Sequence, residues 1–472
     1  MKTILKNLVV VFGLALSLML MLSSCHQKEI VNISRALVQT ANPITSDTLK
    51  GTIKGTLLSG KTYYFKSDIT VNDGDTLLLQ NGVHLIALGD GVTAATSPEI
   101  FVHGTFISLG TQDKPNFITV KNADDLHAQA AQQNYKNVFF GWWGGITCTP
   151  ATASPSNPNP TGGDIIIKWT HIEFGGSPSG ASDDQAIYPS GTSRFNMYFG
   201  NKTKNLIIED SWFYGAKDDN IQVGGGHISI MRNTFELCGG VGGEFFNIKT
   251  GTLGDIAYNF CIGSATNSFK ISDSGTSGIQ CTATVYNNTI VDGGYRQTKS
   301  GRGGSIDFEK GARGRCYNNL IVNCRFGLRI TPDADFANVA YGNQCFYGYS
   351  TAIVNQFYSV DSAPSVLSAK AVSDIISTTP QQNNPMFYGF DVNQFDFTAN
   401  PGPISASLQP YKIVTVGTSN FKILGSSPAI NKGKTDFSPQ RNVTVTGTYG
   451  TTISLPGKDI GCYQNDGTGN QH

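Results

Sequence analysis

The chain has 472 residues, with 34 Lys and Arg against 34 Asp and Glu, so its formal net charge at pH 7 is zero. A neutral protein has no global field that gathers polyanions, which argues against nucleic-acid binding. Only 14% of the residues are charged whereas 54 are glycine, a combination typical of a β-rich protein with many turns.

The first 24 residues have the pattern of a bacterial export signal. Lys2 and Lys6 precede about 14 apolar residues, a stretch too short to span a bilayer. The Leu22–Cys25 segment resembles the lipobox of bacterial lipoproteins, which implies cleavage before Cys25 and lipid on its thiol. The alternative is an ordinary signal peptide, but no A-x-A-like site follows. We expect a mature chain with a net charge near −2, tethered by residues 25–50 to a Gram-negative outer membrane, on its periplasmic face or at the cell surface.

Beyond residue 205 the chain repeats one unit about 22 to 31 residues long. Three successive units read NLIIEDSWFYGAKDDNIQVGGG, HISIMRNTFELCGGVGGEFFNIKTG and TLGDIAYNFCIGSATNSFKISDSG. Each contains a β-rich run, an asparagine before an apolar pair, glycines, a second apolar run and a turn. One such coil cannot bury its apolar face alone, so the coils must stack. The repeat predicts an all-β fold, a parallel β-solenoid.

Segments near both ends look like the first coils and the closing segment of exported bacterial β-helices, namely 61–88, 99–120, 421–433 and 458–464. This resemblance to the pectate-lyase-like superfamily covers roughly residues 50–465 and implies a right-handed parallel β-helix. We therefore expect one β-helix domain over residues 51–465, interrupted by loops, with a short tail over 466–472, and a monomer. Residues 124–137 and 363–378 are expected to form short helices, and residues 149–163 an irregular Pro-rich excursion.

Asparagine recurs at one place in five successive units, at Asn233, Asn259, Asn288, Asn319 and Asn343. Amides repeated every ~4.8 Å along a stack can hydrogen-bond to one another and satisfy a buried turn. We interpret this column as structural.

The eight cysteines after Cys25 contain no C-x-x-C pair, which argues against a zinc site. Export permits disulfides. Cysteines of adjacent coils do not share an offset from the asparagine, so we expect buried, packed thiols rather than bridges between coils.

The second strand of each unit predicts a vertical column of outward residues. Alternation buries one apolar pair per strand, such as Phe246 with Ile248, and turns the residue between them outward. The column so predicted is Tyr198, Gln222, Asn247, Lys270, Asp307 and Arg329. A second column two residues further on contains Lys249, Ser272 and Glu309. One interpretation is a solvated face; the other is a shallow groove for an extended acidic polysaccharide.

A uronate lyase needs a base for the proton beside the carboxylate, a cation that neutralises that carboxylate, and an acid for the leaving oxygen. Lysine can be the base if burial or a neighbouring cation lowers its pKa. Calcium or an arginine can neutralise the carboxylate. Lys249, Lys270 and Arg329 are the candidate catalytic cations of this face, and Tyr198, Gln222, Asn247 and Asp307 its candidate substrate contacts.

The stretch GGEFFNIKTG, residues 242–251, followed by FKIS, resembles the alginate lyase and chondroitinase B family. The resemblance implies that Glu244 helps to bind Ca²⁺, that Lys249 is the base, and that Lys270 stands where the family has an arginine. Asn220 or Asp219, from the preceding strand, would be further calcium ligands. The chain departs from the family at Gly242, where a second acid is expected, and in the turn SDSG, where a histidine is expected.

Two other interpretations remain open. Asp218 and Asp219 prompt comparison with polygalacturonase-type hydrolases, which also need a third aspartate on the preceding coil, a glycine-flanked histidine and an R-x-K. Here the preceding strand reads FNMYFG and the next turn, CGGVGGE, has no histidine. A non-catalytic glycan-binding or structural surface lipoprotein would need only exposed aromatic rings, for which Tyr188, Phe195, Tyr198 and Trp142 or Trp143 are candidates. The sequence leaves open whether the protein is an enzyme.

Overall fold

The computed structural model describes residues 29–31, 42–132, 134–240, 242–273, 275, 278–296, 302–357, 367–368, 370–393, 419–443 and 451–472. The predicted export signal, Cys25 and most of the predicted tether lie outside these residues. None of the described helices is long and apolar enough to cross a membrane.

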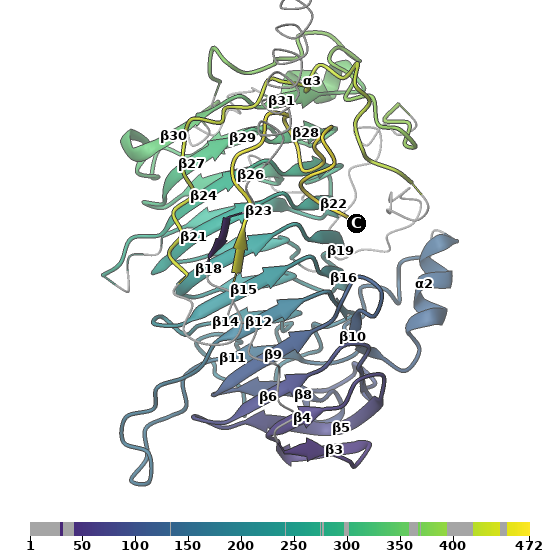
Figure 1. Cartoon of the computed structure of the whole chain (residues 1–472), viewed down its shortest axis with the longest axis vertical. Coiled ribbons are helices and arrows are strands. Elements are labelled where there is room, and N and C mark those ends of the chain that lie inside the picture. Colours follow the sequence, from purple (N-terminus) through teal and green to yellow (C-terminus); the bar gives the residue numbers. More distant parts are fainter. Residues whose placement is uncertain are drawn as a thin grey trace, which may run out of the picture.

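The chain forms a parallel β-helix with three strands in each regular coil, which confirms the predicted fold class (Figure 1). The first stack is an 11-stranded sheet. Its strands are β2 (Pro43–Ile44), β4 (Gly55–Leu57), β6 (Thr76–Leu79), β9 (Thr105–Leu109), β12 (Ile165–Lys168), β15 (Asn205–Glu209), β18 (Gly226–Met231), β21 (Thr252–Ala257), β24 (Thr282–Tyr286), β27 (Arg313–Tyr317) and β30 (Val339–Gly342).

The second and third stacks are joined into a 20-stranded sheet through β5 (Thr62–Val71), which also pairs with β3 (Thr48–Thr52). The second stack contains β7 (His84–Ala87), β10 (Asn116–Val120), β13 (Thr170–Glu173), β16 (Trp212–Ala216), β19 (Thr234–Cys238), β22 (Phe260–Ser264), β25 (Thr289–Val291), β28 (Leu320–Val322) and β31 (Cys345–Tyr347). The third contains β8 (Glu99–Val102), β11 (Gly145–Cys148), β14 (Met197–Phe199), β17 (Ile221–Val223), β20 (Phe246–Ile248), β23 (Asn267–Ser272), β26 (Gly304–Glu309), β29 (Leu328–Ile330) and β32 (Leu367–Ser368). Pairing between coils is parallel throughout the described strands except between β29 and β32.

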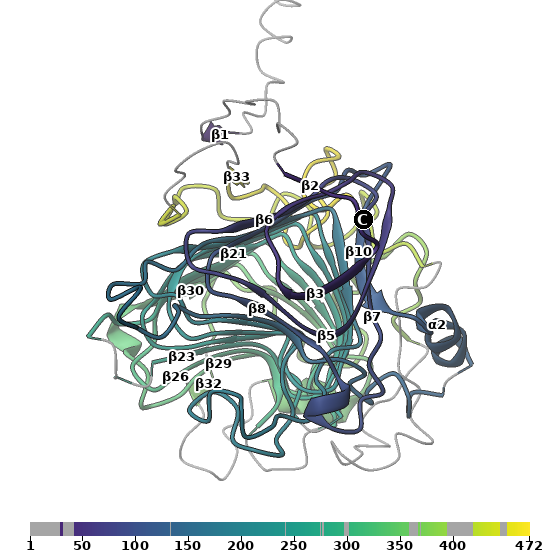
Figure 2. The ribbon, with the colours of Figure 1, turned by 90° about the horizontal axis from the view of Figure 1, so that it is seen from below.

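The core runs along the axis of the stack, enclosed by all three sheets (Figure 2). The alternation predicted for the third stack is confirmed, because Phe246, Ile248, Phe269 and Ile271 are fully buried. Rings pack against one another from coil to coil inside, with Phe246 and Phe269 at 5.0 Å between centroids and tilted by 50°. This packing holds each strand of the third stack in a fixed register with the next.

Side-chain amides form a ladder at the corner between the first and second stacks. Asn233 Nδ2 donates to Asn259 Oδ1 over 2.9 Å, and Asn259 Nδ2 donates to Asn288 Oδ1 over 3.0 Å. Asn288 Nδ2 continues the ladder to Asn319 Oδ1 over 2.9 Å. All four asparagines are fully buried, so the ladder satisfies polar groups that would otherwise destabilise the turn. The structural interpretation of these asparagines is confirmed.

The fifth member of the ladder is Gln344, and the prediction of Asn343 was wrong by one residue. Gln344 Oε1 accepts the backbone N–H of Asn319 over 2.9 Å. Asn343 instead has a φ of +52° and donates to the carbonyl of Lys432. The residue before each ladder amide has a left-handed backbone, which asparagine tolerates better than most side chains. Because Asn343 and Gln344 are both polar and adjacent, the sequence pattern alone fits either of them at the ladder position.

The described parts of the segment from residue 419 onward add no coil to the stack. They run back along the outside of the helix, where they are yellow in Figure 1. The backbone N–H of Gly461 donates to Asn318 over 2.9 Å, and Asn470 Nδ2 donates to the carbonyl of Asn233 over 3.0 Å. Within this segment β33 (Thr451–Ile453) pairs antiparallel with β1 (Glu29–Val31).

The described helices lie outside the stack. Helix α2 (Ala123–Ala131) confirms the helix predicted over 124–137, and α3 (Thr351–Phe357) was not predicted. The short 3₁₀ turns are η1 (Ala94–Thr96) and η2 (Phe336–Asn338). The helix predicted over 363–378 is wrong for residues 370–378, because Asp374 Oδ1 accepts the N–H of Gln344 and the segment pairs with the last coil.

All eight described cysteines are buried and free. This agrees with the expectation drawn from their differing distances to the asparagine of each coil.

Candidate functional site

The outward column predicted on the third stack has the predicted register. Strand pairing places its members one above another, in the order Tyr198, Gln222, Asn247, Lys270, Asp307 and Arg329. The column is much less exposed than a shallow groove requires, since Asn247 is 7% exposed, Asp307 2% and Arg329 4%. The expectation of an open, solvated column is therefore wrong for these three positions. Buried polar and charged groups interact more strongly than solvated ones.

The sequence Glu244-Phe245-Phe246 turns the corner into the third stack. Both phenylalanines are fully buried, and Phe245 packs against Phe235 inside the core at 5.9 Å between centroids. Because two successive residues point inward at the corner, Glu244 lies on the outside, and Asn247 and Lys249 follow it there at alternate positions. This local bend brings an acid, an amide and a lysine to one surface.

Glu244, Asp219 and Asp218 form a chain of carboxyl groups at this corner. Asp219 Oδ1 accepts the N–H of Glu244 over 2.9 Å, and its carboxyl also shares hydrogen bonds with the side chains of Glu244 and Asp218. Burial and the Asp219 carboxylate raise the pKa of Glu244 to about 8. Burial and Glu244 raise the pKa of Asp218 to about 7. Adjacent carboxylates resist simultaneous ionisation, so this chain retains at least one proton at neutral pH unless a cation replaces it.

Lys249 lies beside this carboxyl chain with its side chain partly buried. Burial, together with the ammonium of Lys270, lowers the pKa of Lys249 below its usual value. Among the described residues, its ammonium has neither a hydrogen-bond nor an ion-pair partner. A desolvated lysine next to a second cation is the arrangement that produces a basic amine near neutral pH.

Lys270 differs from Lys249 because it lies among acids. Its Nζ is 3.2 Å from Glu309 Oε1. Although burial alone would lower it, the carboxylates of Glu244, Glu309 and Asp307 raise the pKa of Lys270, which therefore remains an ammonium. The two lysines thus have opposite shifts on one face.

Arg329 and Asp307 form a buried ion pair above Lys270. Arg329 Nη2 is 2.8 Å from Asp307 Oδ2, and it also donates to Asn267 Oδ1 over 2.7 Å. The guanidinium lies over the ring of Phe326. Arg329, predicted as a catalytic cation, therefore already has partners within the chain.

Of the three calcium ligands predicted from the sequence, Glu244 and Asp219 meet at one corner, and Asn220 does not join them. Asn220 Oδ1 accepts a hydrogen bond from Asn196 Nδ2 over 2.7 Å at the core corner. Asp219 uses its Oδ1 for the Glu244 N–H and its Oδ2 for Asn247 Nδ2, at 2.8 Å. No group of three or more His, Cys, Asp or Glu side chains within the described ranges has the arrangement of a metal site. Of the predicted set, Glu244 has the fewest hydrogen bonds to backbone and amide groups, and Asp219 adjoins it.

Asp218 was predicted only as half of an Asp-Asp pair comparable to that of polygalacturonase-type hydrolases, and not as a member of the Glu244 site. A Cβ added to Gly242 would lie 1.7 Å from Asp218 Oδ1, so the Asp218 carboxyl fills the space that a side chain at position 242 would need. The acid that the family resemblance expects at position 242 is thus replaced in space by one from the previous coil. The signal that could have identified Asp218 is its distance of one coil from Gly242.

A loop between β13 and β14 lies beside the lower end of the column, where Tyr188 is 6.1 Å from Tyr198 between ring centroids. Tyr188 and Phe195 of this loop are 2% and 8% exposed, and Trp143 is fully buried, so these candidate sugar-stacking rings belong to the core. Tyr198 and Gln222 are partly exposed, and Trp142 is partly buried with its indole N–H donated to the carbonyl of Asn137. The described face therefore offers charge rather than aromatic rings.

No protein-family model matches the chain, and no curated protein matches it.

Proposed function

We propose that this protein is a polysaccharide lyase that cleaves an acidic, uronate-containing glycan by β-elimination on the third stack. The observation that carries the proposal is the pair of opposite shifts at one corner. The pKa of Lys249 is lowered, so it gives up its proton more readily than an ordinary lysine, and that of Glu244 is raised to about 8, so the two groups on this surface are shifted toward the base and the protonated acid. Groups whose pKa values are driven apart in this way are the usual acid and base of an enzyme.

In the proposed reaction, Lys249 Nζ removes the proton from the carbon that bears the substrate carboxylate. The electrons of that C–H bond form a carbon–carbon double bond, and the bond to the glycosidic oxygen breaks. Glu244 is suited to give its proton to the leaving oxygen, and Lys270 is suited to neutralise the substrate carboxylate. Arg329 and Asp307 hold the upper side of the site through their ion pair. Tyr198, Gln222 and Asn247 would contact the glycan below.

Calcium is a second partner proposed for the same carboxyl groups. The carboxyls of Glu244 and Asp218 are each hydrogen-bonded to the Asp219 carboxyl, and a cation would take the place of the protons they share. Asn247 Oδ1 has no hydrogen-bond partner within the described residues. Calcium takes 6 to 8 oxygen ligands, so water and substrate would have to supply the rest. With calcium bound, Glu244 would be ionised and could not donate a proton, so the two roles of Glu244 exclude one another.

The test is the near-ultraviolet absorbance of new unsaturated ends when protein lacking the lipid is incubated with alginate, chondroitin, pectin or heparin-type glycans. We expect activity in the wild type, a loss of at least about a hundredfold in Lys249→Ala, and unchanged activity in Lys50→Ala, whose side chain is exposed far from this site. If activity persists in the presence of a chelator, Glu244 acts as the proton donor. If activity requires added calcium, Glu244 acts as a calcium ligand.

A non-catalytic glycan-binding or structural role is the second candidate, favoured by the partners that Lys270 and Arg329 already have. Absence of unsaturated ends across the glycan panel would remove the lyase proposal. Binding of an acidic glycan that persists in both Lys249→Ala and Lys270→Ala would then favour a binding module.

We also propose that the chain is an outer-membrane lipoprotein anchored through Cys25 and a distant member of the pectate-lyase-like superfamily. The lipobox-like Leu22–Cys25 supports the first proposal, and the three-stranded coils with an amide ladder support the second. Labelling of the wild type with radioactive palmitate, and no labelling of Cys25→Ala, is the expected result for the lipid anchor.

A further inference from the structure

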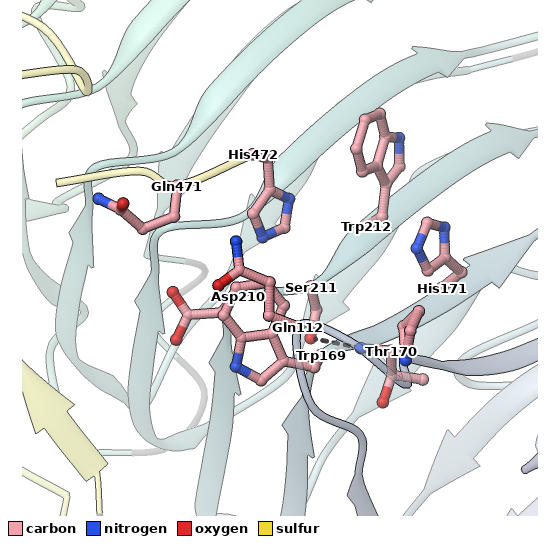
Figure 3. Close-up of a pocket in the computed structure, with 10 residues that line it drawn as sticks. Gln112, Trp169, Thr170, His171, Asp210, Ser211, Trp212, Gln471 and His472 are labelled. Atoms are coloured by element: carbon pink, nitrogen blue, oxygen red, sulfur yellow. Dashed lines mark hydrogen bonds between the residues drawn. The ribbon is translucent and has the colours of Figure 1, made fainter. Parts of the chain in front are cut away.

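A small aromatic pocket lies away from the lysine face, at the corner between the first and second stacks (Figure 3). Its volume is about 180 Å³, smaller than the ~300–1,000 Å³ of sites for drug-sized ligands. Its walls include the rings of Trp169, His171, Trp212 and His472. The space suits one ring rather than an oligosaccharide.

The aromatic walls are held in place by stacking. The ring of His472 lies between the indoles of Trp169 and Trp212, at 5.4 Å and 5.6 Å between centroids and at interplanar angles of 27° and 20°. His171 stacks on Trp212 at 5.5 Å and 10°. The Trp212 indole N–H donates to Glu236 Oε2 over 2.9 Å, which fixes its rotation. The pocket is therefore preorganised by side chains from different parts of the chain.

Trp169 occupies a backbone position that the fold fills more easily with asparagine. Its φ is +49°, in the left-handed region. The equivalent turn positions of later coils are Asp210, Arg232, Tyr258, Asn287, Asn318 and Asn343, so asparagine is the residue that recurs there. A left-handed backbone costs an ordinary residue roughly 1–2 kcal/mol, and asparagine less. The Trp169 ring is only partly buried, so its burial offsets little of this cost. A strained position with a large, accessible ring is an observation from which function can be inferred.

The pocket carries little net charge. Burial lowers the pKa of His472 to about 4 and also lowers the pKa of His171, so both imidazoles are neutral at neutral pH. The acidic side chain among its described lining residues, Asp210, is paired with Arg232 by two hydrogen bonds of 2.8 Å and 3.0 Å. The pocket therefore does not favour an anionic sugar, in contrast to the lysine face.

The polar groups of the pocket lie at its floor and its rim. On the floor, the N–H of Thr170 donates to Ser211 Oγ over 3.2 Å, so these groups are satisfied within the chain (Figure 3). At the rim, the side-chain amides of Gln112 and Gln471 are exposed. Aromatic walls with a few amides at the mouth suit a ring that is apolar on its faces and hydroxylated at its edge.

We propose that this pocket binds a single uncharged pyranose residue of a glycan, with its face against the aromatic walls and its hydroxyl groups toward Gln112 and Gln471. This site is independent of the proposed lyase reaction. It would hold a neutral residue or branch while the lysine face meets acidic residues.

The experiment measures binding of neutral disaccharides, namely maltose, cellobiose, lactose and mannobiose, to the full chain by isothermal titration calorimetry. Trp169→Asn is the main variant, because it removes the ring while introducing the residue type that recurs in later coils. It should keep or raise the thermal stability and weaken sugar binding roughly tenfold or more, which corresponds to about 1.4 kcal/mol. Gln112→Ala, at the exposed rim, should weaken it by a smaller factor.

Lys249→Ala is the matched control, since it alters the other face and should leave neutral-sugar binding unchanged even if it abolishes lyase activity. Binding of none of the four disaccharides at millimolar concentration would overturn the proposal. Binding that is equally strong in Trp169→Asn would also overturn it, as would binding of indole in preference to every sugar.

Discussion

Replacing Glu244 by Gln should stabilise the protein in alkaline solution and change little in mildly acidic solution. Burial and the neighbouring Asp219 raise the pKa of Glu244 from its usual 4.5 to about 8. Between these two values the folded protein holds a proton that the unfolded chain has lost. Stability therefore falls as the pH rises through this interval. A glutamine has no proton to lose, so the variant avoids this decrease.

The size of the effect follows from the shift. One pKa unit is worth about 1.4 kcal/mol, so the interval from 4.5 to about 8 sets an upper bound of roughly 5 kcal/mol at alkaline pH. The carboxyls of Asp218 and Asp219 share the proton with Glu244, and Glu244 is not fully buried. We therefore expect the variant to gain about 2 kcal/mol over the wild type at about pH 9 and nearly nothing at about pH 5.

Urea unfolding at the two pH values, followed by circular dichroism, measures the difference. Asp113→Asn is the control for loss of a carboxyl, because Asp113 is exposed. An equal change at both pH values, or a variant less stable than the wild type in alkaline solution, would refute the account of the carboxyl chain. If calcium binds these carboxyls, adding it should restore the stability of the wild type at alkaline pH and leave the variant less affected.

Three further predictions concern the ladder, the face and the thiols. Asn288→Ala should lower the free energy of unfolding by about 3 kcal/mol, since it leaves several buried partners unpaired, whereas exposed Asn338→Ala should cost less than about 1 kcal/mol; equal losses in urea titrations would contradict this. Ser272→Asp should supply Lys249 with a counter-charge, raise its pKa and shift the pH profile of kcat/KM to alkaline values; an unshifted profile would count against Lys249 as the base. The eight described cysteines should not react with a thiol reagent in the native protein and should all react after denaturation; fast native labelling would contradict their burial.

The sequence predicts the stack and its register well because both depend on local patterns that repeat. Inward alternation at Phe246 and Ile248 is a property of one strand, and the coil length then places Asn247 beside Lys270. The same logic misplaces the ladder by one residue at Asn343, because two adjacent polar residues satisfy the same pattern. It also fails around Asp374. The sequence predicts a helix there, but the segment pairs with the last coil instead.

The burial and pairing of the site could not be predicted from one coil at a time. Whether Asp307 is solvated depends on Arg329 one coil above it, and the space at Gly242 is taken by Asp218 from one coil below. The aromatic pocket is even harder to predict from the sequence. It needs His472 beside Trp169, and these residues are about 300 positions apart in the chain. Contacts of this kind arise from the returning segment, which has no repeat to reveal its path.

The arrangement around Lys249 argues against a merely solvated face. A charged column stabilises itself by alternating signs from coil to coil, as Lys270, Asp307 and Arg329 do. In the neighbouring column the register places Ser272 above Lys249, and the acid one coil higher, Glu309, lies 3.2 Å from Lys270 instead. An acid at position 272 would complete the alternation. The chain leaves Lys249 partly buried and, within the described residues, without a direct ion-pair partner, although the carboxyls of Asp219, Glu244 and Glu309 act on it from further away. A lysine so placed lowers stability and is expected where a basic amine has to meet an external carbon acid.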